Sequence, residues 1–296
     1  MKKPLAYDPQ AGIDLHVHST ASDGTLTPSE ILAMAVSCGL KAIAITDHDT
    51  LTGSAAAVAA GIPPSLHFLT GIEISAAAPP GFQLNGSVHI LGYGIDPGDA
   101  SLSSILSILK SARDHRMPQI IARLNKLGMN LNMDELHGIV GDAIAGRPHI
   151  ARLMVKKGLT ESVDDAFDRF LGKSRPAYVE KHRIPMSDAI GAITHAGGIA
   201  VLAHPYLLGL TEPPTFEAFL RSLKSMGLRG IEAIYPDHTP RKTNEYCRLA
   251  RKYDLLITGG TDYHGAVTPD IKMGIGGGDF HVPYAIYEAM AEHLKQ

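Results

Sequence analysis

The stretch IDLHVHSTASDGTLTPSEI, residues 13–31, decides how the rest of the chain is interpreted. It opens with a short apolar run that ends in His16 and His18, and Asp23 follows in the adjoining loop. Because side chains alternate along a strand, the two histidines share one face. The next segment, TPSE at residues 27–30, predicts a helix start through a capping box. This region therefore predicts a strand that ends in metal-type side chains and leads into a helix.

Apolar runs of this kind recur along the chain and are hydrophobic nearly throughout, as in parallel strands that are covered on both faces. We expect strands at residues 13–18, 42–46, 68–74, 88–93, 199–203, 231–235 and 255–258. Helical patterns lie between several of these runs, which is typical of α/β folds with right-handed crossover connections. Such a parallel sheet is doubly wound or closed, and seven strands favour a barrel one strand short of the usual eight.

Residues 100–185 interrupt this alternation. Their pattern is helical and contains no convincing strand, so we expect a helical insertion between the fourth and fifth barrel strands. Residues 1–99 and 186–296 then form the barrel domain, and residues 100–185 form a small helical insertion domain that caps the substrate.

Histidine or carboxylate side chains recur at the ends of the predicted strands. Strand ends on the C-terminal side of a parallel barrel are where such folds assemble active sites. The residues that converge there are His16, His18, Asp23, His48, Glu73, His89, His204, Asp262 and His264. Mixtures of histidine and carboxylate suit zinc, manganese or iron, and nine ligands with one bridging carboxylate suffice for three metals.

The composition narrows the classes of function. With 27 Lys and Arg against 30 Asp and Glu, the formal net charge of -3 gives no basic field for long nucleic acid, while a local basic pocket for a small phosphorylated ligand remains open. The N-terminal segment lacks the apolar core of a signal peptide, and no apolar run of about 18 residues would span a membrane. The two cysteines are expected to be buried thiols, and together these features indicate the cytoplasm.

Six segments resemble the successive motifs of the PHP (polymerase and histidinol phosphatase) superfamily of metal-dependent phosphoesterases: DLHVHSTASDG, ITDHDT, GIEIS, VHILGYG, LAHP and GGTDYHG. The resemblance covers essentially the whole chain. GRPHIA at residues 146–151, inside the insertion, is similar to the stand-alone RNase AM type, whose members act on 3′,5′-nucleoside bisphosphates and short 5′-phosphorylated RNA. The resemblance implies a distorted (β/α)7 TIM-like barrel that holds three divalent metal ions.

The resemblance also divides the nine ligands among these metals, with Glu73 bridging the first two. The implied sets are His16, His18, Glu73 and Asp262; Glu73, His89 and His204; and Asp23, His48 and His264. Some superfamily members have histidine where Asp23 stands. The harder oxygen ligand favours Mn²⁺, with Fe²⁺ or Zn²⁺ as alternatives.

Substrate contacts are expected outside the metal ligands. Arg147 precedes Pro148 at a helix start, where a guanidinium beside free backbone N–H groups suits a second phosphate. His149, Lys173 and Arg175 are further candidates for phosphate contacts. We expect a small nucleotide or a short oligonucleotide as the substrate, and no obligate protein partner is evident.

The predicted activity is removal of the 3′-phosphate from nucleoside bisphosphates, together with 5′-to-3′ trimming of short 5′-phosphorylated RNA. Metal-bound hydroxide would attack in line, with no protein nucleophile. A small-metabolite phosphatase such as histidinol phosphatase shares most strand-end motifs, and GRPHIA argues against it. A degenerate metal-binding regulatory module would have lost ligands, and none of the nine positions is lost. Base preference and oligomeric state stay open.

Overall fold

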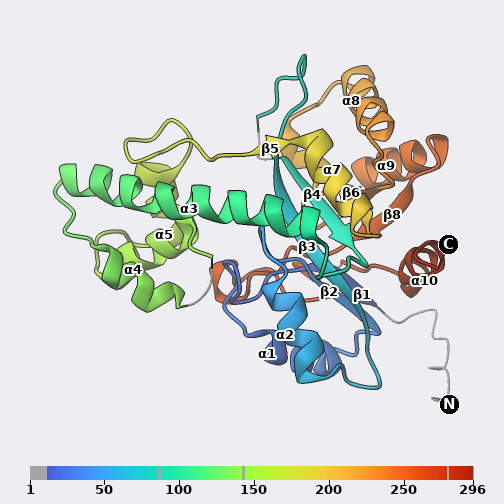
Figure 1. The fold of residues 1–296 in the computed structure, drawn as a ribbon, viewed down its shortest axis with the longest axis horizontal. Coiled ribbons are helices and arrows are strands. Elements are labelled where there is room, and N and C mark those ends of the chain that lie inside the picture. The colour runs from blue at the N-terminus through green and yellow to red at the C-terminus, as the bar shows by residue number, and fades with distance from the viewer. Residues whose placement is uncertain (1–11, 86–87, 142–143, 279, 296) are drawn as a thin grey trace.

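The computed structural model describes residues 12–85, 88–141, 144–278 and 280–295. The strands are β1 (Ile13–Val17), β2 (Ala42–Ile45), β3 (His67–Ala77), β4 (Val88–Tyr93), β5 (Ile184–Pro185), β6 (Ile199–Leu202), β7 (Gly230–Ile234) and β8 (Leu256–Gly259). One sheet runs in the order β1-β2-β3-β4-β6-β7-β8, and β5 pairs with β3 outside that path. Figure 1 shows α2, α7 and α10 on different sides of this sheet.

The sheet curves into a nearly closed barrel. Beyond their ends, β1 and β8 are joined by hydrogen bonds from the His18 N–H to the Tyr263 carbonyl (2.9 Å) and from the Tyr263 N–H to the His16 carbonyl (3.3 Å). Gly260 permits this approach, because a Cβ atom there would lie 2.4 Å from the backbone nitrogen of His16. The predicted seven-stranded TIM-like barrel is confirmed, with β5 as a short addition outside the ring.

One strand runs against the others. β4 is antiparallel to both of its neighbours, β3 and β6, so the prediction of parallel strands throughout is wrong at this position. The link from β3 to β4 spans only residues 78–87, which is too short for the helical crossover that parallel neighbours need. Consequently β4 begins at the rim of the barrel where the parallel strands end.

Helices cover the outside of the barrel and bury its apolar surface. They are α1 (Pro28–Ser37), α2 (Thr52–Ala60), α7 (Met186–His195), α8 (Pro213–Ser225), α9 (Pro240–Lys252) and α10 (Tyr284–His293). Thr27 caps α1, and its reciprocal bonds with Glu30 form the predicted capping box. The largest buried cluster packs α7, α8 and α9 against β3, β4, β6 and β7. This packing fixes the strands whose ends carry the candidate ligands.

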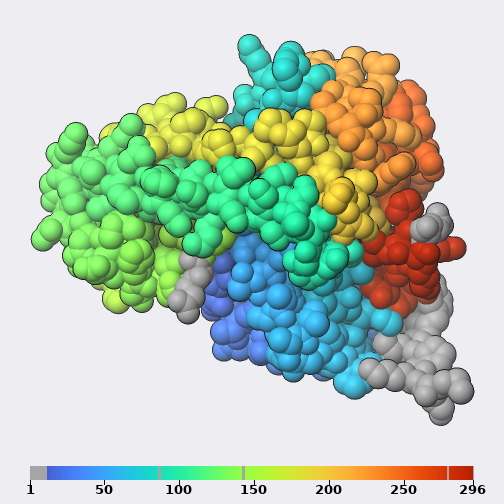
Figure 2. All heavy atoms as spheres, in the orientation of Figure 1, coloured from blue at the N-terminus to red at the C-terminus, as the bar shows by residue number. Residues whose placement is uncertain are grey.

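The segment after β4 is helical and projects from one side of the barrel, as Figures 1 and 2 show in green. It contains α3 (Ala100–Lys126), α4 (Met133–Val140), α5 (Arg147–Lys156), α6 (Val163–Ala166) and the π-helical turn η1 (Phe167–Leu171). Met117 and Leu136 belong to its own apolar cluster, whereas Leu102 and Leu109 of α3 belong to the barrel cluster. The long helix α3 therefore ties this segment to the barrel.

Two smaller expectations fail. The pattern of residues 100–185 predicts no strand, yet β5 pairs there with β3, because a two-residue strand is too short to produce a periodic signal. Cys38 is exposed at the C-terminal end of α1, so the expectation of a buried thiol is wrong for this residue. Within the described part of the chain, every helix is too short or too polar to cross a membrane.

Candidate metal centre

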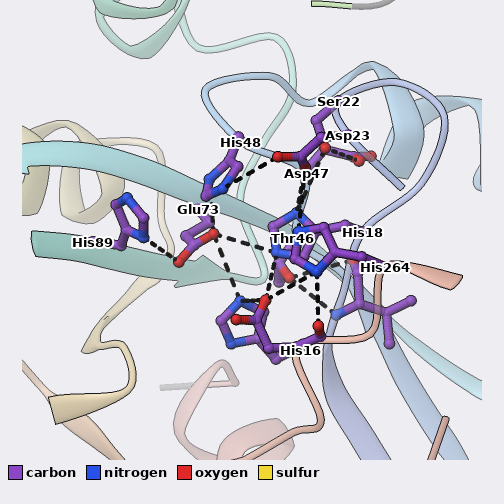
Figure 3. A network of polar contacts seen from close by, with 12 residues as sticks. His16, His18, Ser22, Asp23, Thr46, Asp47, His48, Glu73, His89 and His264 are labelled. Atoms are coloured by element: carbon purple, nitrogen blue, oxygen red, sulfur yellow. Dashed lines mark hydrogen bonds and ion pairs between the residues drawn. The ribbon is translucent and has the colours of Figure 1, made fainter. Parts of the chain in front are cut away.

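The predicted metal-type side chains lie together at one end of the barrel, and Figure 3 shows seven of them as labelled sticks. His16 and His18 come from β1 and the residue after it, Glu73 comes from β3, and Asp262 follows β8. His89, expected where its strand ends, instead lies at the start of β4. The reversed direction of β4 brings His89 to the same rim as the others.

The first group of ligands surrounds two carboxylates. Oδ1 of Asp262 lies 3.2 Å from His16 Nε2 and 3.0 Å from His18 Nε2. Oε2 of Glu73 lies 3.6 Å and 3.3 Å from the same two nitrogens. Two imidazoles and two carboxylate oxygens therefore converge on one point.

Glu73 also contacts three further histidines of the cluster. Its Oε2 atom lies 2.8 Å from His48 Nδ1, and its Oε1 atom lies 2.7 Å from His89 Nδ1 and 2.9 Å from His204 Nε2. The Glu73 side chain is only 1% exposed. A single buried carboxylate thus connects the first group of ligands to the second.

A third group forms around Asp23. Its Oδ1 atom lies 3.3 Å from His264 Nε2, and its Oδ2 atom lies 3.8 Å from His48 Nε2. The rings of His18 and His264 stack with centroids 4.1 Å apart. The loop that follows β1 therefore contributes its carboxylate to the same cluster as the strand ends.

In the structure, more of the candidate ligands belong to two groups at once than the resemblance implies. The groups whose ligand atoms lie within 4.8 Å of one another are His18, Asp23, His48 and His264; His16, His18, Glu73 and Asp262; and His48, Glu73 and His89. His18, His48 and Glu73 each belong to two groups. His204 stands outside these groups, although its Nε2 atom lies against Glu73 Oε1.

The cluster fits divalent cations because many of its buried polar atoms have no hydrogen-bond partner among the described residues. They are His16 Nε2, His18 Nε2, Asp23 Oδ1, His48 Nδ1, Glu73 Oε2, His89 Nε2, His204 Nδ1 and Asp262 Oδ1. A buried polar atom without a partner costs free energy, and nearly all such atoms in proteins are paired. Imidazole nitrogens and carboxylate oxygens that converge in this way are the donors that divalent transition metals take.

The PHP domain model matches residues 14–173, a segment that contains six of the nine predicted ligands and more than half of the chain. This chain belongs to the PHP family. Its relatives and structural neighbours agree with that assignment.

The chain is 33% identical over 257 residues to the 3′,5′-nucleoside bisphosphate phosphatase of Chromobacterium violaceum, which covers 86% of this chain and 87% of that protein. It is 32% identical over 251 residues to a 5′-3′ exoribonuclease of Haemophilus influenzae, covering 85% of this chain and 89% of the relative. A crystal structure described as a metal-dependent phosphoesterase from Bifidobacterium adolescentis matches with a TM-score of 0.84 and 29% identity, over 95% and 96% of the two chains. This PHP protein is a metal-dependent hydrolase of phosphoric esters.

A buried carboxylate behind the PHP cluster orients two of its histidines. Glu232 of β7 is fully buried; its Oε1 atom lies 2.9 Å from His16 Nδ1, and its Oε2 atom accepts a hydrogen bond from the backbone N–H of His204 at 2.7 Å. Such outer carboxylates fix the orientation of imidazole ligands and raise their basicity. Sequence reasoning missed Glu232, although a lone carboxylate inside an apolar strand was a usable signal.

Two further aspartates hold the loops that carry ligands. Asp47 accepts hydrogen bonds from the Ser19 N–H (2.8 Å) and the Ser22 hydroxyl (2.6 Å), which fixes the loop before Asp23. Asp14 accepts the N–H (2.9 Å) and the hydroxyl (2.6 Å) of Thr261, next to Asp262. These aspartates are buried in the barrel. Their role is to position ligands rather than to bind metal.

Strained backbone also aims residues at the rim. Asp262 has φ = 55°, His204 has φ = 25° and Asp49 has φ = 55°. Non-glycine residues rarely adopt such angles, each of which costs about 1–3 kcal/mol and persists only where the surroundings enforce it. The hydrogen bonds of Asp14 and Glu232 supply that enforcement next to Asp262 and at His204.

The charges of the cluster are coupled. Burial opposes protonation of His16, yet the carboxylates of Glu232, Asp262 and Glu73 raise its pKa well above the usual value. Burial likewise opposes ionisation of Glu73, yet His89, His48 and His16 hold its pKa well below the usual value. Because metal ligands must be deprotonated imidazoles, a cation that binds here replaces protons on the histidines.

A basic cavity of about 140 Å³ lies against the cluster, between the barrel rim and the helical segment. It is lined by Asp23, His48, His89, Arg113, Arg116, Gly146, Arg147, Pro148, Phe167 and Lys181. Burial, together with Arg147 and Arg113, lowers the pKa of Arg116 to about 10. Burial and Arg113 lower the pKa of Lys181 to about 7. The cations of this cavity repel one another. A bound anion would reduce that repulsion, so the cavity suits an anion.

The structure separates the four predicted substrate contacts. Arg147 lines the basic cavity, and its guanidinium lies 5.3 Å from the ring centroid of Phe167. His149 is buried, accepts the Gly146 N–H at 3.1 Å and stays outside the cavity lining. Lys173 and Arg175 are exposed and do not line the cavity. Sequence reasoning missed Arg113, Arg116 and Lys181, because each is one charge among many on helical or loop segments.

A buried ion pair joins the helical segment to the cluster. The Arg113 guanidinium of α3 donates to Asp49 Oδ2, with a distance of 2.9 Å from Nε. Asp49 also accepts the N–H (2.7 Å) and the hydroxyl (2.9 Å) of Ser75. Burial opposes ionisation of Asp49, but Arg113 and Lys181 hold its pKa well below the usual value. Because Asp49 follows His48 directly, this pair couples the position of α3 to a candidate ligand.

Metal binding should raise the stability of the protein. We expect Mn²⁺ at 100 times its Kd to add about 2.7 kcal/mol to the free energy of unfolding, because the folded cluster alone presents converging ligands. The measurement is Tm by calorimetry, with and without chelator, for the natural protein and for Glu73→Gln. The rise in Tm caused by Mn²⁺ should become smaller as pH falls, because protons compete with the metal for the imidazoles. Equal Tm values for the natural protein with Mn²⁺ and with chelator would contradict the assignment.

Loss of Arg113 should leave Asp49 buried without its partner. We expect Arg113→Met to cost about 3–5 kcal/mol in the free energy of unfolding and the double variant with Asp49→Asn to recover most of that loss. Urea unfolding measures both values. Lys110→Met on the same helix is the control, because its ion pair with Asp114 is exposed and should be worth about 0.5 kcal/mol. Strictly additive effects of the Arg113 and Asp49 substitutions would argue against the coupling.

Proposed function

We propose that this PHP enzyme removes the 3′-phosphate of 3′,5′-nucleoside bisphosphates and trims short 5′-phosphorylated RNA from its 5′ end. The observation that carries this proposal is the position of the basic cavity, which shares Asp23, His48 and His89 with the metal-type cluster. A substrate held by one phosphate in the cavity would present a second phosphate, one sugar away, to the cluster. The relatives named for these two activities support the proposal.

The cavity would bind the 5′-phosphate. Asp49 pairs with Arg113 and lies 4.0 Å from Lys181 Nζ, so Arg116 and Arg147, which pair with no carboxylate among the described residues, are the cations most available to an anion. Guanidinium groups form short, charge-assisted hydrogen bonds to phosphate oxygens. A phosphate would also offset the burial and the repulsion by Arg147 and Arg113 that together lower the pKa of Arg116. A cavity of about 140 Å³ suits a terminal phosphate rather than a continuing chain.

Water is the proposed nucleophile. The described residues that line the cavity include no serine, threonine or cysteine, and the hydroxyls of Ser19 and Ser22 donate to Asp47. The water oxygen bonds to phosphorus while the bond from phosphorus to the 3′ oxygen breaks, and the 3′ oxygen takes up a proton. Divalent cations in the cluster, when bound, would polarise the water and neutralise charge on the phosphoryl oxygens.

We further propose three divalent cations, with Mn²⁺ favoured and Fe²⁺ or Zn²⁺ as alternatives, and Glu73 shared between two of them. The mixture of imidazole and carboxylate donors supports this choice. Residues 100–185 would act as the substrate cap, since Arg113, Arg116 and Arg147 all come from them. The cytoplasm is the proposed location, where small nucleotides and RNA fragments are found.

A phosphatase for a metabolite with one phosphate, such as histidinol phosphate, is a weaker alternative. Such a substrate would occupy the cluster and leave the basic cavity without an anion. A regulatory module that merely binds metal is also weaker, because the complete ligand set lies beside a pocket suited to phosphate.

The test is a comparison of substrates with and without the 5′-phosphate. We expect the Mn²⁺-loaded protein to release phosphate from adenosine 3′,5′-bisphosphate with a far higher kcat/KM than from adenosine 3′-monophosphate or histidinol phosphate. Arg147→Ala should lower kcat/KM for the bisphosphate about 10- to 100-fold, the worth of a charge-assisted hydrogen bond, and change the 3′-monophosphate little. Phosphate release measured over a range of substrate concentrations gives each value.

Arg175→Ala is the matched control, because this exposed arginine of the same segment does not line the cavity. Metal content measured on each variant separates substrate binding from loss of the cluster. Equal turnover of the bisphosphate and the 3′-monophosphate by the natural protein would refute the role of the cavity. A preference for histidinol phosphate would replace the proposed substrate class.

A further inference from the structure

A second hollow, of about 520 Å³, lies on the opposite side of the barrel rim from the basic cavity. The basic cavity takes rim residues that follow β1 and β2 or begin β4, whereas the hollow forms after β7, across the ring in strand order. Figure 1 shows α5 and α9 on opposite sides of the sheet. Tyr235 joins the hollow to the cluster, since its hydroxyl donates to Asp262 Oδ2 at 3.1 Å.

Aromatic rings lead outward from the cluster on this side. The Tyr235 ring centroid lies 5.7 Å from that of His204 and 5.3 Å from that of His238, which in turn lies 6.2 Å from that of Tyr206. Tyr206 belongs to the short helix η2 (Pro205–Leu208), two residues beyond His204, and its side chain is 46% exposed. We call Tyr206, Tyr235 and His238 the aromatic shelf. Tyr235 and His238 line the hollow, and Tyr206 lies beside it through its contact with the His238 ring.

The hollow also offers polar groups and another ring. Thr243 and Asn244 line it from the first turns of α9, and Phe280 contributes an aromatic side chain. Hydroxyl and carboxamide groups can pair with the donors and acceptors on the edge of a nucleobase, while rings stack on its face. This combination suits a flat, polar-edged ring better than it suits a phosphate.

We propose that the aromatic shelf binds the base of the second nucleotide in a 5′-phosphorylated RNA fragment. This inference rests on the proposed function. With the 5′-phosphate in the basic cavity and the scissile phosphate at the cluster, the chain continues across the rim toward Tyr206. The exposed Tyr206 ring stacks on that base, and such stacking tolerates any sequence because every base has an aromatic face.

The shelf would favour short RNA over a nucleoside bisphosphate. A bisphosphate ends at the scissile phosphate and leaves the shelf empty, whereas a dinucleotide reaches it. The described residues that line the hollow include no lysine or arginine, so the hollow offers no such cation to a phosphate. Binding beyond the scissile bond therefore depends on stacking more than on counterion release, which differs from an extended basic track.

The test compares Tyr206→Ala with the natural Mn²⁺-loaded protein on two substrates. We expect kcat/KM for a 5′-phosphorylated diadenylate to fall about 10-fold, the usual scale of a lost base stack, and kcat/KM for adenosine 3′,5′-bisphosphate to change less than about twofold. Tyr206→Phe should restore dinucleotide cleavage. Leu207→Ala, an exposed neighbour on the same turn, is the control for local structure.

A second readout needs no catalysis. A dinucleotide with 2-aminopurine at the second position should lose fluorescence on binding to the metal-free natural protein and not to Tyr206→Ala; the chain has no tryptophan to interfere. Equal losses of activity on both substrates, no loss on either, or cleavage of the bisphosphate alone by the natural protein would overturn the shelf. Cleavage of neither substrate by the natural protein would overturn the proposed function, and the shelf with it.

Discussion

The buried carboxylate of Glu73 is the constraint on which the rest of the structure depends. Ring nitrogens of five histidines lie within 3.6 Å of its two oxygens. Such a group is costly to bury unless opposite charges surround it. The barrel surrounds Glu73 with histidines by bringing strand ends from around the ring to one rim. The reversed strand β4 contributes His89 from its start. Cations bound there would neutralise the buried charge of Glu73 further than the imidazoles do.

The proposed selectivity of this phosphoesterase site comes from the helical segment. α3 packs on the barrel through Leu102 and Leu109, and it carries Arg113 and Arg116 over the rim. Arg113 pairs with Asp49, and this ion pair fixes the helix beside His48. The other arginine, Arg116, lines the basic cavity and is available to the proposed substrate. A cation that already pairs with a buried carboxylate holds the structure in place. A cation without such a partner can bind a substrate anion.

The sequence predicted the barrel and the cluster of candidate ligands at its rim because both signals are local. A histidine or carboxylate at the end of an apolar run is visible without tertiary information, and the capping box at Thr27 is a contact within one turn. The direction of β4 depended on the length of its connection to β3. Glu232 stood out as the one carboxylate of an apolar strand, but its partners, His16 and His204, are distant in sequence and could not be inferred.

The basic cavity was harder to predict for a different reason. Arg113, Arg116 and Lys181 look like solvated charges until the helical segment is packed on the barrel, and Arg175 looks equally suitable although it is exposed. Which cation faces the site is a tertiary property. Arg147, which was predicted from the GRPHIA segment and from Pro148 at the helix start, does line the cavity.

The most direct test of the account is a crystal structure of the Mn²⁺-loaded protein, measured at the manganese absorption edge. The account predicts anomalous density within bonding distance of both Glu73 oxygens, and a further peak among Asp23, His48 and His264. Absence of anomalous density beside Glu73 in crystals of a protein that still hydrolyses phosphate esters would contradict it.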